Sequence, residues 1–248
     1  MRFQERVVRK AQPINSSKSK GATRIHASLQ VSKSLANNTV WHRASVTREE
    51  RARLNGHKAV ALWFTGLSGA GKSTLAHAVE RRLYEMKCQT FVLDGDNVRH
   101  GLCKDLGFSH KDRTENIRRL GEIIKLFLDS GTISLAAFIS PFREDRDRVR
   151  ALLGPGEFIE IYCHCPIDIC EQRDTKGLYR RARRGEIHDF TGISSPYEEP
   201  QNPELFLNTG TQPLDECVNR IVGLLLQRSI VLAQANSREK EKGLSFHG

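Results

Sequence analysis

The chain has 248 residues and a formal net charge of +10, and this length suits one α/β domain with extensions. Residues 1–47 carry nine Lys or Arg and a single acid, Glu5, which leaves 30 basic and 28 acidic residues for the rest. This near balance argues against nucleic acid as the partner of a folded domain. No segment approaches the roughly 18 consecutive apolar residues of a membrane span, so we expect no membrane partner either.

The two ends of the chain differ in composition from the middle. Residues 1–38 mix Ser, Asn, Lys and Arg with few large apolar side chains, which predicts a flexible basic extension. Residues 234–248 predict a polar tail, and residues 39–233 a single folded domain. The extension lacks a continuous hydrophobic signal region, so we expect a cytoplasmic protein. Its basic, acid-poor character leaves organelle targeting as the alternative.

A phosphate-binding motif follows the first apolar run. Residues 66–73 read Gly-Leu-Ser-Gly-Ala-Gly-Lys-Ser and fit the pattern G-x-x-x-x-G-K-[ST]. The run over 59–65 predicts a buried strand, and the spacing after Ser73 predicts a helix. The glycines allow backbone amides to surround a phosphate, with Lys72 reaching the β/γ-phosphates and Ser73 holding Mg²⁺. The predicted ATP-binding residues are Gly66, Leu67, Ser68, Gly69, Ala70, Gly71, Lys72, Ser73 and Thr74.

Further strands and helices alternate along the chain. The apolar patterns predict strands over 89–94, 132–139 and 157–163, and helices over 112–130, 143–153 and 214–226. The helix over 143–153 is rich in charge, so we expect it on the surface. Residues 176–203 break the alternation. Repeated strand–helix units predict an α/β fold with a mostly parallel sheet and helices on both faces.

The six cysteines contain no C-x-x-C pair, which argues against a disulfide framework. Cys163, His164, Cys165 and Cys170 would be conceivable metal ligands. Cys163 and Cys165, however, lie at the end of the apolar run that predicts a core strand. We therefore expect buried thiols, because free cysteine commonly behaves as a small core hydrophobe.

Polar residues follow two of the predicted strands. Asp94 and Asp96 come after one, and Ser140-Pro141-Phe142-Arg143 after another. In open α/β sheets, ligands bind beyond the carboxyl ends of the strands, so these segments and the phosphate loop should share a pocket. Phosphoryl transfer uses carboxylates for Mg²⁺ and for the attacking hydroxyl, and arginines for phosphate or sulfate oxygens. Ser73, Asp94 and Asp96 are the predicted magnesium ligands. The alternatives are a solvated turn for the two acids and, for at least half of Arg99, Arg113, Arg118 and Arg119, a solvated helix face.

An ordered set of segments, spread over roughly residues 40–228, resembles the adenylyl-sulfate kinase family. The segments are residues 66–74, 94–102, 112–119, 138–143, 176–179, 190–193 and 196–198. The resemblance implies a P-loop kinase fold with a mobile lid at about 176–197. It also implies ATP-dependent phosphorylation of the 3′-hydroxyl of adenosine 5′-phosphosulfate (adenylyl sulfate), which gives 3′-phosphoadenylyl sulfate and ADP. Mg²⁺ is the expected metal, and a homodimer and a sulfate adenylyltransferase are the implied protein partners.

The same resemblance assigns residues to the substrate site. It places Phe190 on the adenine of adenylyl sulfate, and Arg180, Arg181, Arg183 and Arg184 of the lid near the transferring phosphates; a basic surface loop is the alternative for the lid. Lys72, Asp96 and Ser140 are the candidate catalytic residues. Ser140 either carries a phosphoserine, as described for bacterial members, or only donates a hydrogen bond while transfer is direct, which we favour. The substrate-binding set is Asp96, Arg99, Arg113, Asn116, Ile139, Ser140, Lys176, Gly177, Leu178 and Phe190.

Two other function classes compete with this interpretation. One is a small P-loop kinase that acts on a different hydroxyl, which the Asp-Gly-Asp-Asn and Phe-Ile-Ser-Pro segments disfavour. The other is a nucleotide-gated RNA-binding or scaffold protein that uses the basic extension, for which the sequence offers no aromatic-rich basic motif. A GTP-dependent switch is disfavoured because the chain contains no Asn-Lys-x-Asp.

Overall fold

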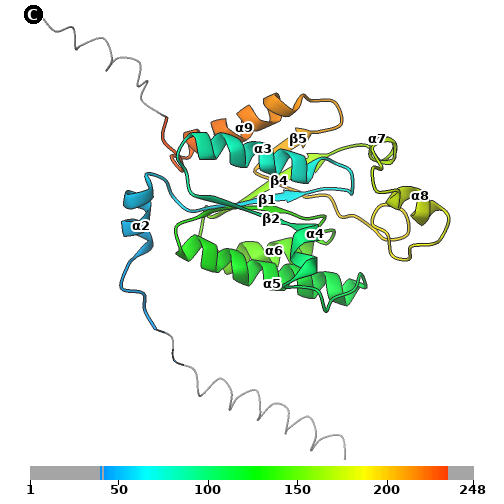
Figure 1. Cartoon of the computed structure of the whole chain (residues 1–248), viewed down its shortest axis with the longest axis horizontal. Helices are drawn as coiled ribbons and strands as arrows, with labels where there is room; N and C mark the ends of the chain where they lie inside the picture. The colour runs from blue at the N-terminus through cyan, green and yellow to red at the C-terminus, as the bar shows by residue number, and fades with distance from the viewer. Residues whose placement is uncertain (1–39, 41, 234–248) are drawn as a thin grey trace, which may run out of the picture. The chain divides into compact units, whose positions relative to one another are not determined.

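The computed structural model describes residues 40 and 42–233, so the predicted extension over 1–38 and tail over 234–248 lie outside the described residues. The chain divides into two compact units, residues 1–45 and 46–248. The second unit holds a five-stranded parallel sheet of order β2-β3-β1-β4-β5 (Figure 1). Its strands are β1 Ala61–Thr65, β2 Thr90–Asp94, β3 Ile133–Ala137, β4 Phe158–His164 and β5 Leu205–Asn208. The predicted parallel sheet is confirmed.

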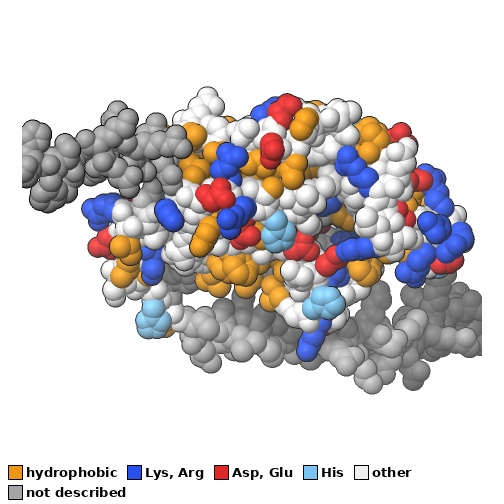
Figure 2. Space-filling view, turned by 45° about the horizontal axis from the view of Figure 1, so that its top comes forward, with side chains coloured by type: hydrophobic (Ala, Val, Ile, Leu, Met, Phe, Trp, Pro, Cys, Tyr) orange, Lys and Arg blue, Asp and Glu red, His pale blue; other side chains and the backbone are white. Residues whose placement is uncertain are grey.

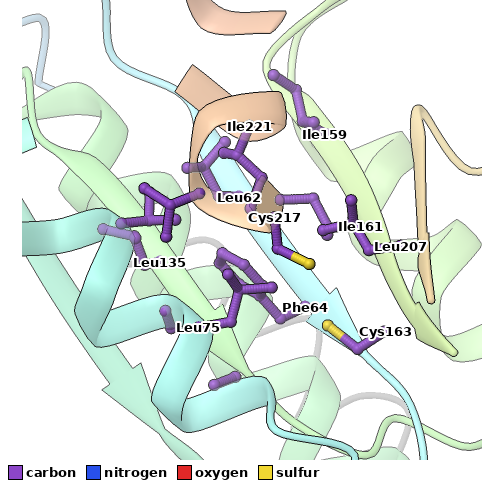
Figure 3. Packing of buried hydrophobic residues seen from close by; sticks show 14 of the residues in the cluster. Leu62, Phe64, Leu75, Leu135, Ile159, Ile161, Cys163, Leu207, Cys217 and Ile221 are labelled. Atoms are coloured by element: carbon purple, nitrogen blue, oxygen red, sulfur yellow. The ribbon is translucent and has the colours of Figure 1, made fainter. Parts of the chain in front are cut away.

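Helices cover both faces of the sheet, as predicted (Figure 1). Helices α3 (Lys72–Glu85) and α9 (Leu214–Gln227) pack together on one face, and α5 (His110–Asp129) and α6 (Arg143–Leu152) on the other. The alternation of side chains along β1 separates the two cores. Leu62 and Phe64 join the cluster under α3 and α9 (Figure 3), whereas Trp63 joins the cluster under α5 and α6.

The structure contains short elements that the sequence patterns did not predict. They are helices α2 (Arg48–Asn55), α4 (Gly95–His100), α7 (Ile167–Gln172) and α8 (Leu178–Arg183), and strand β5. Helix α2 has no buried residue, so it lacks an apolar stripe, but the hydroxyl of Thr47 and the carboxylate of Glu50 form a capping box at its start. Strand β5 has only four residues, too few for a clear alternation.

The prediction that α6 is a surface helix is wrong at two positions. The side chains of Asp145 and Arg146 are only 4% and 2% exposed. A charge can be buried when it is paired and hydrogen-bonded, and the Arg146 guanidinium faces the Glu160 carboxylate of β4 at 2.7 Å. The buried face of α6 could not be recognised from the sequence, because two of its three buried residues are charged.

All six cysteines are buried with free thiols, as predicted. Cys163 on β4 points into the core under α3 and α9, close to Cys217 of α9 (Figure 3). Burial raises the pKa of the Cys163 thiol to about 12, so it remains protonated at neutral pH. Among the described residues, no helix combines the length and apolar character required to cross a membrane.

Candidate active site

A cleft of about 1250 Å³ opens beyond the carboxyl ends of the parallel strands. Its walls come from the phosphate loop after β1, the start of α4 after β2, the loop after β3, and residues 173–191. The volume exceeds that of a usual site for one small ligand, about 300–1000 Å³. The cleft is therefore large enough for two nucleotide-sized molecules. Its position is where open α/β sheets bind ligands.

The phosphate loop, residues 66–73, joins β1 to α3. Gly66 has φ 150° and lies so close to β4 that a Cβ atom would come within 2.4 Å of the Cys163 carbonyl oxygen. Gly71 has φ 83° and precedes the first residue of α3. Side chains at these positions would strain the turn, so the loop needs glycine to direct the positive end of α3 at the cleft.

Lys72 is folded over the loop in this structure. Its Nζ donates hydrogen bonds to the carbonyl oxygens of Gly66 at 3.0 Å and Leu67 at 2.6 Å. The side chain is 8% exposed, and this burial lowers its pKa to about 8. The ammonium group thus occupies the loop that would surround a phosphate, and a bound anion would favour its charged form.

Ser73 and Asp94 join the loop to the end of β2. The Ser73 hydroxyl donates to Asp94 Oδ2 at 2.5 Å, and Asp94 Oδ1 accepts the amide of Asp96 at 2.9 Å, which caps α4. The carboxylate of Asp96 forms an ion pair across the cleft with Lys176. Lys176 begins the predicted lid, residues 176–197, which is called the lid below. The three predicted magnesium-binding side chains therefore lie in one part of the cleft.

Two arginines and an aromatic ring form another wall. The guanidinium of Arg99 lies 4.3 Å from the centre of the Phe108 ring, and that of Arg113 lies 6.0 Å from it. Burial lowers the pKa of both arginines, and the nearby charge of Arg99 adds to this effect on Arg113. In the described part of the chain, neither guanidinium is within ion-pair distance of a carboxylate. This wall offers paired positive charge to an anion.

Arg113 also holds the lid. Its Nη1 donates to the hydroxyl of Thr191 at 2.8 Å and its Nη2 to the carbonyl oxygen of Asp189 at 2.5 Å. A helix face on α5 and the distal part of the lid are thus joined by one guanidinium. An anion bound to Arg113 would compete with these contacts.

Asn116, one turn along α5 from Arg113, has a buried polar atom without a partner. The residue is 5% exposed and lines the cleft, and its Oδ1 accepts no hydrogen bond from the described residues. A buried acceptor left unpaired is costly, about 1–3 kcal/mol, so such groups usually mark a missing donor. A hydroxyl or amino group of a bound molecule would satisfy Asn116.

The hydroxyl of Ser140 is used inside the protein. It accepts a hydrogen bond from Trp63 Nε1 at 3.0 Å and donates to Thr65 Oγ1 at 3.0 Å. Ser140 is 2% exposed and has φ 40°, a left-handed conformation that is uncommon for a residue other than glycine. The Thr65 hydroxyl also lies 2.9 Å from Tyr197 Oη, so the network reaches the end of the lid.

The lid arginines differ in where they lie. Lys and Arg side chains gather at the end of the molecule where α8 lies (Figure 2). Of the four predicted to face the phosphates, Arg181 lines the cleft, whereas Arg180, Arg183 and Arg184 do not. Arg183 pairs with Glu171, and Arg184 with Glu186. The helical turn of α8 explains the split, since consecutive side chains point in different directions.

The structure brings most of the predicted site residues together. Gly66, Leu67, Ala70 and Gly177 are the exceptions: they shape turns and do not line the cleft. Sequence reasoning missed the end of the cleft that follows β5, where Arg173 donates to the Thr209 carbonyl oxygen at 3.1 Å. Had the sequence identified β5 as a strand, Thr209 would have been expected at the cleft, because it follows the carboxyl end of that strand. It also missed Phe108, for which the sequence gives no clear signal.

Comparison with known proteins agrees with this geometry. The family model for adenylylsulphate kinase matches residues 58–208. The adenylyl-sulfate kinase of Acaryochloris marina is 60% identical over 196 residues, 79% of this chain and 96% of that protein. The one from Bacillus velezensis is 62% identical over 183 residues, 74% of this chain and 93% of that protein. The APS kinase of Mycobacterium tuberculosis, solved with AMPPNP and APS, is 47% identical with a TM-score of 0.66, and covers 68% of this chain and 98% of that one. With matches over most of its length and a P-loop cleft of this form, the chain belongs to the adenylyl-sulfate kinase family.

Proposed function

We propose that this protein transfers the γ-phosphoryl group of ATP to the 3′-hydroxyl of adenylyl sulfate, giving 3′-phosphoadenylyl sulfate and ADP. The observation that carries the proposal is one cleft with a phosphate loop on one side and, on the other, the Arg99–Arg113 pair beside the unpartnered Oδ1 of Asn116. Such a cleft suits two anionic nucleotides held face to face. The solved relative from Mycobacterium tuberculosis carries AMPPNP and APS together.

In this proposal, the phosphate loop binds the phosphoryl donor, ATP. The amides of residues 66–73 and the start of α3 would surround the β- and γ-phosphates. Lys72 would leave the carbonyl oxygens of Gly66 and Leu67 and move its charge to the transferring group. Positioned donors of this kind stabilise the transition state most where water is excluded.

The acceptor side uses Arg99, Arg113 and Asn116. The two forked guanidinium groups would bind the phosphosulfate oxygens, and Asn116 Oδ1 would accept a hydrogen bond from the nucleoside. Phe190, which lines the cleft next to the buried ring of Tyr179, offers a face for the adenine. Asp96 would orient the 3′-hydroxyl and receive its proton. Substrate must then displace Lys176 from Asp96.

We propose direct transfer, without a phosphorylated Ser140. The Ser140 hydroxyl is 2% exposed and already bonded to Trp63 and Thr65, so an attack on ATP would require the loop to rearrange. A loose transition state requires positioning and charge neutralisation rather than a covalent carrier. In this proposal, the hydroxyl of Ser140 holds the loop after β3 against β1 through its bonds to Trp63 and Thr65.

Mg²⁺ fits the donor set at the end of β2. The hydroxyl of Ser73 and the carboxylates of Asp94 and Asp96 are hard oxygen ligands of the kind that Mg²⁺ prefers, and few protein ligands suffice because phosphates and water complete its shell. When bound, the ion would neutralise charge on the phosphates. Asp94 would have to exchange its bond from Ser73 for this role.

We propose that the protein is cytoplasmic and, as the family resemblance implies, is a homodimer that receives its substrate from a sulfate adenylyltransferase. A structural relative from Thiobacillus denitrificans, 32% identical with a TM-score of 0.55, is described as hexameric, and this chain covers 32% of it. Light scattering after size-exclusion chromatography measures the mass directly. A hexamer or a monomer would contradict the dimer.

The test of function is ADP release with different acceptors. Purified protein is supplied with ATP, Mg²⁺ and either adenylyl sulfate, adenosine 5′-monophosphate or another hydroxyl compound, and the nucleotide product is identified by mass spectrometry. We expect ADP only with adenylyl sulfate, together with a product heavier by one phosphoryl group. The variant Lys72→Met is the control for a contaminating kinase. Equal rates with adenosine 5′-monophosphate, or no rate with any acceptor, would contradict the proposal.

A further inference from the structure

Arg146 is the least exposed charged side chain among the described residues, at 2%. Its guanidinium donates three hydrogen bonds to three different parts of the chain. Nε donates to Glu160 Oε1 of β4 at 2.7 Å, Nη1 to the carbonyl oxygen of Ser140 at 2.6 Å, and Nη2 to the carbonyl oxygen of Glu198 at 2.7 Å. One buried cation thus joins the sheet, the loop after β3 and the segment after the lid.

The bond to Ser140 bears on the part of the cleft that the loop after β3 forms. Ser140 has a left-handed backbone, which is strained for a residue other than glycine and persists only where neighbours impose it. The neighbours here are Trp63 and Thr65 at the hydroxyl and Arg146 at the carbonyl oxygen. Arg146 therefore supports the backbone that presents Ile139 and Ser140 to the cleft.

The bond to Glu198 bears on the lid. Residues 198–204, which we call the strap, run from the lid toward β5. The Glu198 amide donates to the Pro141 carbonyl oxygen at 2.8 Å, and Glu198 Oε2 accepts the amide of Arg143 at 2.8 Å. The strap is thus attached to the same loop that Arg146 holds at Ser140. Phe190 and Thr191 of the lid line the cleft, and the Phe190 carbonyl oxygen accepts the amide of Ser195, a few residues before the strap, at 3.1 Å. A displaced strap would therefore shift them.

We propose that Arg146 is a positioning residue for phosphoryl transfer: it fixes the loop at Ser140 and the strap at Glu198 in one geometry, and so sets the lid against the acceptor site. Arg146 itself does not line the cleft. This inference rests on the proposed function for its kinetic consequences, but the geometric coupling exists without any substrate. Because the guanidinium is planar and forked, an ammonium group cannot reproduce its three bonds.

The variant Arg146→Lys tests this role, since it retains a positive charge opposite Glu160. Small displacements of a reacting group cost about 10²-fold in rate, so we expect kcat/KM for adenylyl sulfate to fall by about that factor. The KM for ATP should change far less, because neither the phosphate loop nor Lys72 contacts Arg146. Such a split between substrates would not follow from a general loss of stability.

Arg150→Lys is the matched control. Arg150 lies one turn along the same face of α6 and pairs with Glu160 and with Glu204 of the strap, but it contacts neither Ser140 nor the Glu198 carbonyl. We expect its kcat/KM for adenylyl sulfate to stay close to that of the unmodified protein. An equal loss in Arg150→Lys would overturn the proposal, because the charge network as a whole would then be responsible.

Replacement of Arg146 alone removes one of the two cations that pair with the buried Glu160 and could destabilise the fold. A second variant separates this effect from the loss of positioning. In Arg146→Met with Glu160→Met, both buried charges are removed, and replacement of a buried pair by apolar residues is often neutral for stability. The carbonyl oxygens of Ser140 and Glu198 still lose their donor. We expect a folded protein with the same loss of kcat/KM for adenylyl sulfate; wild-type kinetics in a folded double variant would overturn the proposal.

Trp63 gives a signal that needs no substrate. The chain has two tryptophans, so in a Trp41→Phe background the emission comes from Trp63, whose Nε1 donates to Ser140 Oγ. We expect the Arg146 variants, but not Arg150→Lys, to shift this emission. Unchanged emission and unchanged kinetics in Arg146→Lys would refute the coupling. If the unmodified protein failed to phosphorylate adenylyl sulfate, the proposed function would fail, while the emission would still test the coupling.

Discussion

Tyr179, the second residue of α8, donates its hydroxyl hydrogen to the carbonyl oxygen of Ser68 at 2.9 Å. The contact joins the lid to the phosphate loop across 111 positions of sequence. The Tyr179 ring is 1% exposed and packs edge-on against Phe190, with 5.0 Å between the ring centres. One side chain therefore contacts both the donor loop and the ring expected to hold the acceptor adenine.

The variant Tyr179→Phe removes this hydrogen bond and keeps the ring. A single hydrogen bond contributes about 0.5–1.5 kcal/mol, which corresponds to roughly a 2–10-fold effect. We expect the KM for ATP to rise by that factor and ATP hydrolysis without acceptor to increase, because the lid would exclude water less well. Tyr84→Phe, at an exposed position of α3, is the control. Unaltered hydrolysis and ATP affinity in Tyr179→Phe would contradict the role of this contact.

Lys72 predicts a pH dependence on the donor side. Burial lowers its pKa to about 8 in the free protein, so its positive charge is lost as the pH rises through that value. We expect kcat/KM for ATP to fall above about pH 8, since this ratio reports groups of the free enzyme. Lys72→Met should lose at least about 10²-fold in kcat, a loss typical of such donors, and should lack the inflection. An inflection that persists in Lys72→Met would assign it to another group.

The same lowered pKa of Lys72 makes the free energy of unfolding depend on pH. The unfolded chain retains the ordinary lysine value of 10.5, so between about pH 8 and 10.5 it binds more protons than the folded protein. The free energy of unfolding therefore gains from Lys72 as the pH rises through this window. Urea unfolding of the wild type and Lys72→Met across this range measures the difference. If the variant had the same slope with pH as the wild type, the burial effect would be excluded.

Asn116→Leu separates binding from folding. The substitution removes a buried acceptor without a partner, so we expect no loss of thermal stability, while kcat/KM for adenylyl sulfate falls by about 10–100-fold. The KM for ATP should change less, because Asn116 lies on α5, away from the phosphate loop. Kinetics with each substrate varied in turn, together with a melting curve, provide the test. A defect confined to the kinetics with ATP would contradict the assignment of Asn116 to the adenylyl sulfate site.

Ser140→Ala tests direct transfer. We expect turnover to continue and stability to fall by about 1 kcal/mol, since the buried Nε1 of Trp63 loses its acceptor. The unmodified protein, quenched in acid during turnover with radiolabelled ATP, should carry no label on serine. The proposal of direct transfer fails if Ser140→Ala is inactive and the unmodified protein is labelled at Ser140.

Several features of the fold and site could be predicted from short stretches of sequence. The phosphate loop is one, because its glycines, lysine and serine are neighbours in the chain and the turn they form depends on local backbone freedom. The strands and helices that build both cores are another, since burial of one face imposes a period on the apolar residues. The acids after β2 and the serine after β3 follow from strand ends alone.

Only the tertiary structure decided how these parts are joined. Trp63 and Ser140 are 77 positions apart, and Thr65 and Tyr197 are 132 apart, yet they share one hydrogen-bonded network. Arg146 lies in a helix whose sequence indicates exposure, but it is buried because acceptors from three distant segments surround its guanidinium. A periodic pattern of apolar residues indicates which positions are buried. It does not indicate which remote carbonyl or carboxylate group will hydrogen-bond to a buried charge.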